Sequence, residues 1–256
     1  MHPDWLVPGW DAPGVGALMT TRAGGASAAP FRSMNLGAHV GDEMAAVEHN
    51  RGRFAAALGA MPLFLRQVHG ITVLRLTRAD LQDRAAQRDA DASVTTEAGL
   101  ACTVLVADCL PVLFAAPGAR AVGAAHAGWR GLAAGVLEAT LARVCEAADC
   151  ESVQVQCWMG ACIGPRRFEV GVDVLQAFGS APAGDLGAGA PLGFEPRGNG
   201  KWLADLPSLA RTRLRAAGVT AIHGGQWCSV EGPDRFFSYR REGVTGRMAA
   251  AIWIER

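Results

Sequence analysis

Four short runs of apolar residues constrain what this chain can fold into more than any other feature. A strand whose side chains are all apolar must be covered on both faces, so such runs are typical of fully buried strands. Two further segments indicate strands: residues 153–159 alternate between apolar and polar side chains, and the tail at 248–254 ends on the β-favouring residues Ile252, Trp253 and Ile254. The four apolar runs are residues 71–76, 102–107, 111–115 and 121–125.

Three segments have the pattern of helices. Residues 42–58 place apolar side chains along one side behind an aspartate that is a candidate cap, and residues 132–145 carry an amphipathic face. The third segment, residues 205–217, has a proline in its first turn and a glycine directly after its end. Strands and helices do not alternate regularly as βαβ units, which favours an α+β fold. We expect one domain over residues 1–256, with a flexible loop rich in Gly, Ala and Pro at about 179–200.

Charge and composition argue against several classes of protein. The 24 basic and 24 acidic residues cancel, which removes the long-range attraction that binders of nucleic acid or anionic membranes use. Half of the residues are hydrophobic, yet no stretch approaches the roughly 20 apolar residues of a membrane span. The N-terminus has no leader pattern, and the seven cysteines are odd in number. We therefore expect reduced thiols in a cytoplasmic protein with no nucleic-acid or membrane partner. The pattern indicates no particular oligomeric state.

Chemically versatile residues lie at the ends of the expected strands. His69 precedes one strand, and His126 lies where another gives way to a helix across two glycines. Asp108 and Cys109 lie side by side at a break between two apolar runs. Imidazole and thiolate are good zinc ligands, and three of them would leave a fourth position open for water or substrate. Separations of 40 and 17 residues match no local metal motif, however, so spacing alone favours structural roles for the two histidines and the cysteine.

Six short strings change this weighting, because in their common order they resemble the YfiH-like family. That family is also labelled polyphenol oxidase (laccase) domain and peptidoglycan editing factor. The resemblance extends over nearly the whole chain, since residues 35, 40–42, 50–51 and 91–95 also match. The strings are RQVHG at 66–70, ADCLP at 107–111, HAGWRG at 126–131, CIGP at 162–165, FFSYRR at 236–241 and TGR at 245–247.

The resemblance implies a compact α/β/β/α layered domain with mixed sheets and a zinc site built from His69, Cys109 and His126. It further implies a zinc-dependent purine nucleoside phosphorylase whose partners are phosphate and adenosine, inosine, guanosine or methylthioadenosine. Adenosine deaminase activity is implied beside phosphorolysis. One departure is Ser229, which stands after Cys228 where the family has a threonine.

Four more residues are candidates for substrate binding or acid–base chemistry. Arg66 and Arg130 flank two of the implied ligands and offer forked donors to phosphate, although exposed or ion-paired arginines are the ordinary alternative. Asp108 is expected to orient a ligand or to act as an acid or base, unless it only caps a turn. Asn35 is a candidate for holding a ribose hydroxyl or the base.

Two other functions use the same residues. A cysteine hydrolase or amidase would use Cys109 as nucleophile and a histidine as base, and it would suit a cytosolic peptidoglycan precursor. A multicopper polyphenol oxidase is disfavoured, because the chain has six histidines and no His-x-His pair. Copper remains an alternative to zinc at a site of two histidines and a cysteine.

Overall fold

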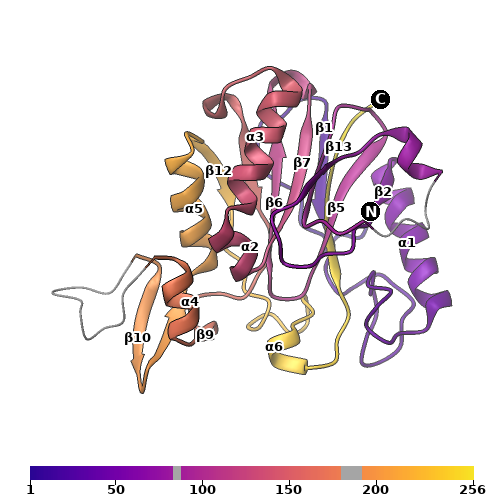
Figure 1. The fold of residues 1–256 in the computed structure, drawn as a ribbon. Coiled ribbons are helices and arrows are strands. Elements are labelled where there is room, and N and C mark those ends of the chain that lie inside the picture. Colours follow the sequence, from indigo (N-terminus) through magenta and orange to yellow (C-terminus); the bar gives the residue numbers. More distant parts are fainter. Residues whose placement is uncertain (83–87, 180–191) are drawn as a thin grey trace.

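The computed structural model describes residues 1–82, 88–179 and 192–256, in which two mixed β-sheets stack face to face (Figure 1). The larger sheet consists, in spatial order, of β12 (Ala221–Gly224), β8 (Gln156–Met159), β6 (Leu110–Ala115), β7 (Val122–Ala127), β4 (Ala92–Thr95) and β3 (Val73–Arg75). The smaller sheet consists of β1 (Val15–Met19), β13 (Met248–Ile254), β5 (Leu100–Val106) and β2 (Met61–Leu63).

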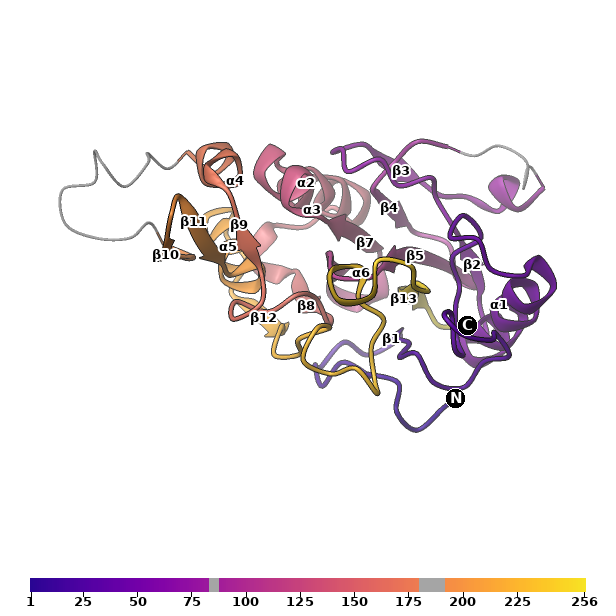
Figure 2. The same cartoon turned by 90° about the horizontal axis from the view of Figure 1, so that it is seen from below.

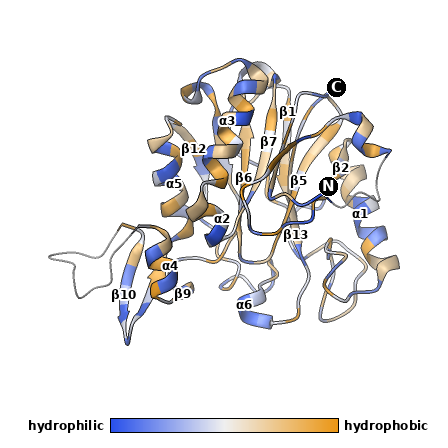
Figure 3. Cartoon of the chain, viewed as in Figure 1, coloured by the Kyte–Doolittle hydropathy of each residue, from blue (hydrophilic) through white to orange (hydrophobic). Residues whose placement is uncertain are grey.

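Helices cover the outer face of each sheet. The helix α1 (Met44–Leu58) packs on the smaller sheet through Phe54 and Leu58. The larger sheet is covered by α2 (Trp129–Ala134), α3 (Val136–Ala148) and α5 (Leu206–Ala216). Figure 3 shows the central strands as mostly hydrophobic, while hydrophilic residues lie along the helices. The α/β/β/α layering and the mixed sheets implied by the family resemblance are thus confirmed.

Alternate side chains of the central strands pack in different layers, which explains why these strands are apolar throughout. In β13, Ala250 and Ile252 pack between the two sheets, whereas Ala251 and Trp253 face the layer of α1. The strand β6 divides its side chains between the inter-sheet core and the core under α3 in the same way. The buried strands predicted at 102–107, 111–115 and 121–125 are confirmed, as is the strand predicted for the tail.

A third sheet lies beside these layers. It has the order β10 (Phe194–Gly198), β11 (Lys201–Ala204) and β9 (Glu169–Val170), and α4 (Val172–Ala177) follows β9 along the chain. Figure 2 shows this sheet beside α5, on the side of the molecule away from α1. The loop predicted at 179–200 is therefore wrong for its last part, because β10 pairs with β11. Residues 180–191 of that predicted loop lie outside the described residues.

The predicted helices are confirmed with corrections at their ends. The segment predicted as one helix at 132–145 is two helices, because Gly135 between α2 and α3 adopts a left-handed φ of 105°. Asp42 does not cap α1: its carboxylate accepts hydrogen bonds from Glu43 N and Asn35, and Glu43 is the N-cap residue. The helix α5 begins as predicted, behind Asp205, which accepts a hydrogen bond from the backbone N–H of Ser208 at 3.0 Å.

Two predicted strands are shorter than their patterns. Only Val73–Arg75 of residues 71–76 pairs, and β3 is half-exposed because it lies at the edge of its sheet. In the segment 153–159, Ser152–Gln154 forms a turn of 3-10 helix and β8 covers only Gln156–Met159. No helix within the described ranges is both long and apolar enough to cross a membrane.

Candidate metal centre

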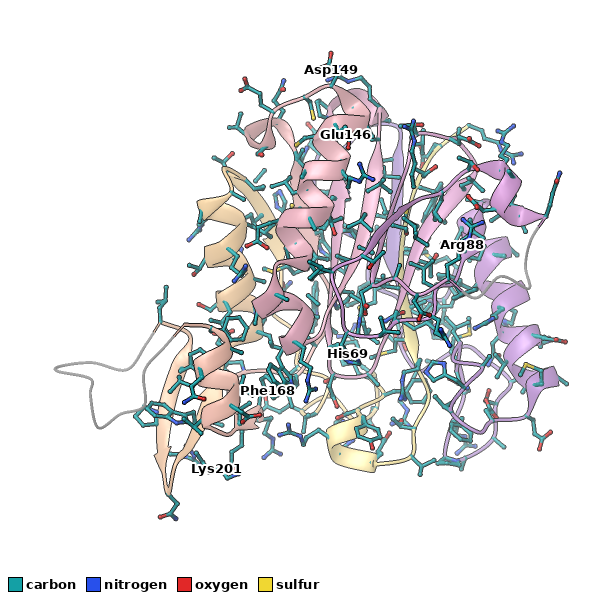
Figure 4. The ribbon with its side chains drawn as sticks, in the orientation of Figure 1. His69, Arg88, Glu146, Asp149, Phe168 and Lys201 are labelled. Atoms are coloured by element: carbon teal, nitrogen blue, oxygen red, sulfur yellow. The ribbon has the colours of Figure 1, made fainter. Side chains whose placement is uncertain are left out.

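Two connections and the end of a strand meet at one end of the stacked sheets. Cys109 lies in the short link from β5 to β6, and His126 lies near the end of β7, which pairs with β6. The register places His126 opposite Pro111, two residues beyond Cys109. His69 lies in the connection between β2 and β3, and Figure 4 shows it at the end of the sheets opposite Asp149.

The loop that carries His69 is held against β5 by the side chain of Gln67, whose amide pairs with the β5 backbone as a neighbouring strand would. The amide of Gln67 donates to the carbonyl of Leu105 and accepts from its N–H, both at 2.8 Å. This pairing brings the next residues of the loop to the end of β5, where Cys109 follows. His69 itself adopts a left-handed φ of 61°, which turns its side chain out of the loop toward the thiol.

The two histidines and the cysteine form a group of metal-ligand type. One ligand atom from each residue lies within 4.8 Å of the other two, and Cys109 Sγ lies 3.7 Å from His69 Nε2. In tetrahedral zinc sites, ligand atoms at roughly 2.0–2.3 Å from the ion are roughly 3.3–3.8 Å apart. The donor types therefore fit a divalent ion, and the three ligand atoms would need to move only slightly closer together to bind it. Three protein ligands would leave one position open.

Gly128 makes room for this group. A Cβ atom at position 128 would lie 2.6 Å from His69 Cδ2 and 3.1 Å from Cys109 Sγ. Real Cβ atoms do not approach ring carbons this closely, so any other residue at 128 would displace His69. This is the reason for a glycine directly before α2, where the chain passes the three donors.

Asp91, which the sequence analysis did not single out, is the residue that joins the histidines. Its buried carboxylate accepts a hydrogen bond from His126 Nδ1 at 2.8 Å. The same carboxylate accepts three bonds from the backbone N–H groups of Val68, His69 and Gly70, at 3.1, 2.9 and 2.7 Å. Because Nδ1 of His126 carries the proton, Nε2 keeps its lone pair for a metal. Its place in the segment 91–95, which matches the family, was the available sequence signal.

Charge interactions within the group favour the ionised thiol. Burial opposes ionisation of Cys109, but the charge of His126 and hydrogen bonds with both histidines lower the thiol pKa to about 6. Burial likewise opposes protonation of His126, but the charge of Cys109 and the hydrogen bond to Asp91 raise its pKa to about 9. Without a metal the group therefore favours a thiolate beside a protonated His126, and a metal that binds both residues takes the place of the proton on Nε2.

Asp108 lies beside the group but is held by structural bonds. One carboxylate oxygen accepts from the hydroxyl of Ser229 at 2.5 Å, and the other accepts from the backbone N–H of Arg240 at 2.7 Å. Asp108 has a left-handed φ of 91°, and this strained conformation bends the link that presents Cys109. Arg240 belongs to the short helix α6 (Tyr239–Glu242), so Asp108 joins this helix to the metal-ligand link.

Of the other predicted binding residues, Arg66 and Asn35 are engaged by protein partners, whereas the Arg130 guanidinium makes no hydrogen bond or ion pair with the described residues. Arg66 forms a forked ion pair with Asp89, and Arg130 is exposed with its guanidinium 4.3 Å from the centre of the Trp129 ring. Asn35 is completely buried, and its amide makes four hydrogen bonds, two with Gly37 and one each with Asp42 and the N–H of Arg247. It therefore has no hydrogen-bonding capacity left for a substrate.

The remaining cysteines near the centre are not ligands. Cys162 is buried in the core, where burial raises its pKa well above the ordinary value. Cys228 is half-buried and lines a separate cavity of about 410 Å³ at the start of α5, together with Asp205, Trp227 and Glu231. None of the three metal-ligand residues lines that cavity.

Only one group of three potential ligands occurs in the described part of the chain. A multicopper oxidase needs several copper ions held by many histidines, and the chain has six histidines in total. The geometry thus supports a single-ion site rather than a cluster of copper ions.

Comparison with known proteins places the chain in a family. A family model described as "Multi-copper polyphenol oxidoreductase laccase" matches residues 16–255. The chain is 48% identical to a purine nucleoside phosphorylase of Pseudomonas aeruginosa, with 98% of each chain covered. It is 47% identical to the purine nucleoside phosphorylase YfiH of Escherichia coli, over 97% of this chain and 98% of that one.

Two solved structures have the same fold. A Neisseria meningitidis protein superposes with a TM-score of 0.88 at 42% identity, over 99% of this chain and all of that chain. YlmD from Geobacillus stearothermophilus superposes with a TM-score of 0.88 at 34% identity, over 98% and 96% of the two chains. The chain belongs to the YfiH-like family, whose model carries the laccase description.

Proposed function

We propose that this protein is a metal-dependent purine nucleoside phosphorylase, with zinc at His69, Cys109 and His126. The observation that carries the proposal is the convergence of these three donors, with one open position, in a chain whose relatives over its full length are named purine nucleoside phosphorylases. Phosphorolysis would join phosphate to C1′ of the ribose as the bond to the purine nitrogen breaks, yielding the base and ribose 1-phosphate.

The residues of the chain have separate tasks in this proposal. Asp91 keeps the proton of His126 on Nδ1 and holds the backbone of the His69 loop, so both imidazoles stay oriented. Asp108, through Ser229 and Arg240, fixes the link that carries Cys109. A bound zinc ion supplies Lewis acidity and can lower the pKa of a coordinated water. Adenosine deamination, which needs an activated water rather than phosphate, belongs to the proposal as a side activity of the same site.

Zinc is proposed over copper on the chemistry of the donors. Two imidazoles and one thiolate with an open fourth position are a donor set that zinc uses in catalytic sites. Copper generally binds such ligands more tightly, so the metal found after purification depends on supply as well as on affinity. Metal analysis of protein purified without added metal decides between the two.

A second candidate, a cysteine hydrolase acting on a peptidoglycan precursor, is favoured by one observation. Asp91 and His126 form a carboxylate–imidazole pair, and Cys109 interacts with that imidazole. The same arrangement activates a cysteine nucleophile in hydrolases. Removal of the metal distinguishes the two functions, because a chelator should abolish metal-dependent turnover and leave a thiol nucleophile active.

We further propose that residues 1–256 form one domain and that the protein is cytoplasmic. The first proposal is supported by the apolar layer that the two large sheets share. The second is supported by the seven cysteines, all of them free thiols, which the reducing cytosol preserves.

The deciding experiment identifies products by chromatography. Protein of defined metal content is incubated with adenosine, with and without phosphate. Adenine and ribose 1-phosphate formed only with phosphate support phosphorolysis, and inosine formed under both conditions supports deamination. If zinc-loaded protein converts none of adenosine, inosine and methylthioadenosine, the proposed function is overturned.

A pair of cysteine variants serves as the matched control. Cys109→Ala is expected to lose metal and turnover together. Cys145→Ala is expected to keep both, because Cys145 is a half-buried thiol near the end of α3. Its neighbour Glu146, which is labelled in Figure 4, lies far from His69. Turnover in metal-free Cys109→Ala protein would contradict the assignment of the site.

A further inference from the structure

An arginine far from the metal ligands in sequence lies beside them in the sheet. Arg247 directly precedes β13, and Met248 of β13 is the register partner of Val106 in β5. Because the two strands are antiparallel, Arg247 lies alongside Ala107, next to Asp108 and Cys109. The sequence string TGR at 245–247 thus reaches the same link that presents the metal-ligand thiol.

The guanidinium of Arg247 has one bonded edge and one free edge. Its Nη1 donates to the carbonyls of Thr245 and Gly246, at 2.9 and 3.2 Å. Among the described residues, Nε and Nη2 make no hydrogen bond, and Arg247 forms no ion pair. The nearby Arg241 has no such free edge, because its guanidinium donates hydrogen bonds to three backbone carbonyls and to Glu242. Nε and Nη2 are the pair of donors that recognises oxyanions in a forked manner.

The surroundings hold Arg247 in place. Its backbone N–H donates to Asn35 Oδ1 at 2.8 Å, which gives the buried Asn35 a positioning role. Gly37 lies against the side chain, because a Cβ at position 37 would be 2.8 Å from Arg247 Cγ. The centre of the Tyr239 ring lies 5.9 Å from the guanidinium carbon. A long side chain held in this way loses little conformational freedom when it binds a ligand.

Acidic groups lie near Arg247, but none of the described residues forms an ion pair with it. Burial lowers the pKa of Arg247, although the charges of Cys109 and Asp108 act in the opposite direction. The pKa of His39 is lowered by burial and then by the charges of Arg247 and Arg51. Both carboxylate oxygens of Asp108 are already bonded elsewhere. A half-buried guanidinium without a paired carboxylate has lost part of its hydration, which a bound anion would compensate.

We propose that the free Nε–Nη2 edge of Arg247 binds a tetrahedral oxyanion beside the metal-ligand group. In naming this anion as the phosphate co-substrate, the proposal rests on the proposed function. Arg247 then takes the role that sequence proximity had suggested for Arg66. Arg66 is occupied by Asp89, whereas Arg247 has both an open edge and a position next to Cys109.

The test measures phosphate binding and kinetics in zinc-loaded wild-type, R247Q and R247K proteins. Loss of a forked, charge-assisted interaction predicts a rise in the phosphate KM of about 10- to 100-fold for R247Q. The nucleoside KM should change by less than about 2-fold, since the free edge addresses only the anion. R247K should fall between wild type and R247Q, because it keeps the charge and loses the fork. Binding of inorganic phosphate, followed by calorimetry, should weaken by the same factors.

Two further variants control the result. Arg53→Gln removes an exposed arginine from α1, and it should change neither constant. If Arg66→Gln raises the phosphate KM and R247Q does not, the inference is overturned. Zinc content and the thermal midpoint are measured for each variant. If R247Q does not fold, R247K carries the test, and an unchanged phosphate constant in R247K overturns the inference.

The calorimetric arm separates this inference from the proposed function. Phosphate binding that depends on Arg247, in a protein that makes no ribose 1-phosphate, would uphold the anion site and refute the phosphorylase proposal. Phosphorolysis with a phosphate KM and a phosphate affinity unaffected at position 247 would uphold the function and refute the site.

Discussion

Replacing Asp91 with asparagine should damage the metal centre whichever way the new amide is oriented. The carboxylate of Asp91 accepts four hydrogen bonds, two at each oxygen. An amide NH2 group cannot accept, so two of the four donors lose their partner. If the NH2 group replaces Oδ1, it faces His126 Nδ1, which must then become an acceptor. The proton moves to Nε2, and His126 is no longer a ligand.

In the opposite orientation the NH2 group replaces Oδ2 and faces the N–H groups of Val68 and Gly70. These two donors lose their partner, and the loop that carries His69 loosens. Each unsatisfied buried group costs about 1–3 kcal/mol, so with two such groups the free energy of unfolding of D91N should fall by about 2–6 kcal/mol. Loss of this kind of support for a metal ligand lowers metal affinity by about 10- to 100-fold.

Competition with a chromogenic chelator measures the zinc affinity of D91N, and urea unfolding of metal-free protein measures its stability. Ser93→Ala is the matched control, because Ser93 is also buried on β4 and its hydroxyl has no hydrogen-bond partner among the described residues. Ser93→Ala should leave zinc affinity unchanged. If D91N binds zinc as tightly as wild type and unfolds at the same urea concentration, the argument that Asp91 orients both histidines is refuted.

Three further predictions follow from single positions. Gly128→Ala should weaken zinc binding by at least about 10-fold while the protein stays folded, because the new Cβ would meet the ring of His69 at 2.6 Å; equal affinity by chelator competition would contradict this. Gly52→Ala should raise the free energy of unfolding by about 0.5–1 kcal/mol, since Gly52 lies within α1 and an added Cβ meets nothing within 4 Å; urea unfolding checks it. Burial opposes ionisation of Glu242, but hydrogen bonds from Thr245 and Arg241 and the charge of Arg22 hold its pKa below the ordinary 4.5. The contribution of Glu242 to stability is therefore complete above pH 4.5, and it is lost as the pH falls through the lowered pKa. E242Q should therefore cost most at neutral pH, and its stability gap from wild type should narrow below pH 4.5; a gap that widens in acid would show the wrong sign.

Local patterns predicted most of the elements because their signals are short in sequence. The apolar runs of β5, β6 and β7 indicate burial on both faces, and Asp205, Pro207 and Gly218 mark the two ends of α5. Errors arose where neighbours in space decide. Gly135 divides a segment that is apolar along one face, and β10 exists because β11 pairs with it.

The three candidate metal ligands were named from the sequence only with the help of a family resemblance. Their spacing carries no metal signal, because the three residues come from two separate connections and the end of a strand, which meet only when the sheets form. Asp91 was overlooked for the same reason. Its partners lie 21 to 35 residues away, and nothing in the order of residues marks a hydrogen bond across a loop.

The arginines show what sequence determines and what tertiary structure decides. Sequence determines which side chains can recognise phosphate, and adjacency to a ligand favoured Arg66. Tertiary structure decides which guanidinium keeps donors to spare: Arg66 faces Asp89, while the register of β13 with β5 carries Arg247 from the other end of the chain to Cys109. The free donors and the net charge around each guanidinium depend on which groups lie near it in space, and those distances are set only when the chain folds.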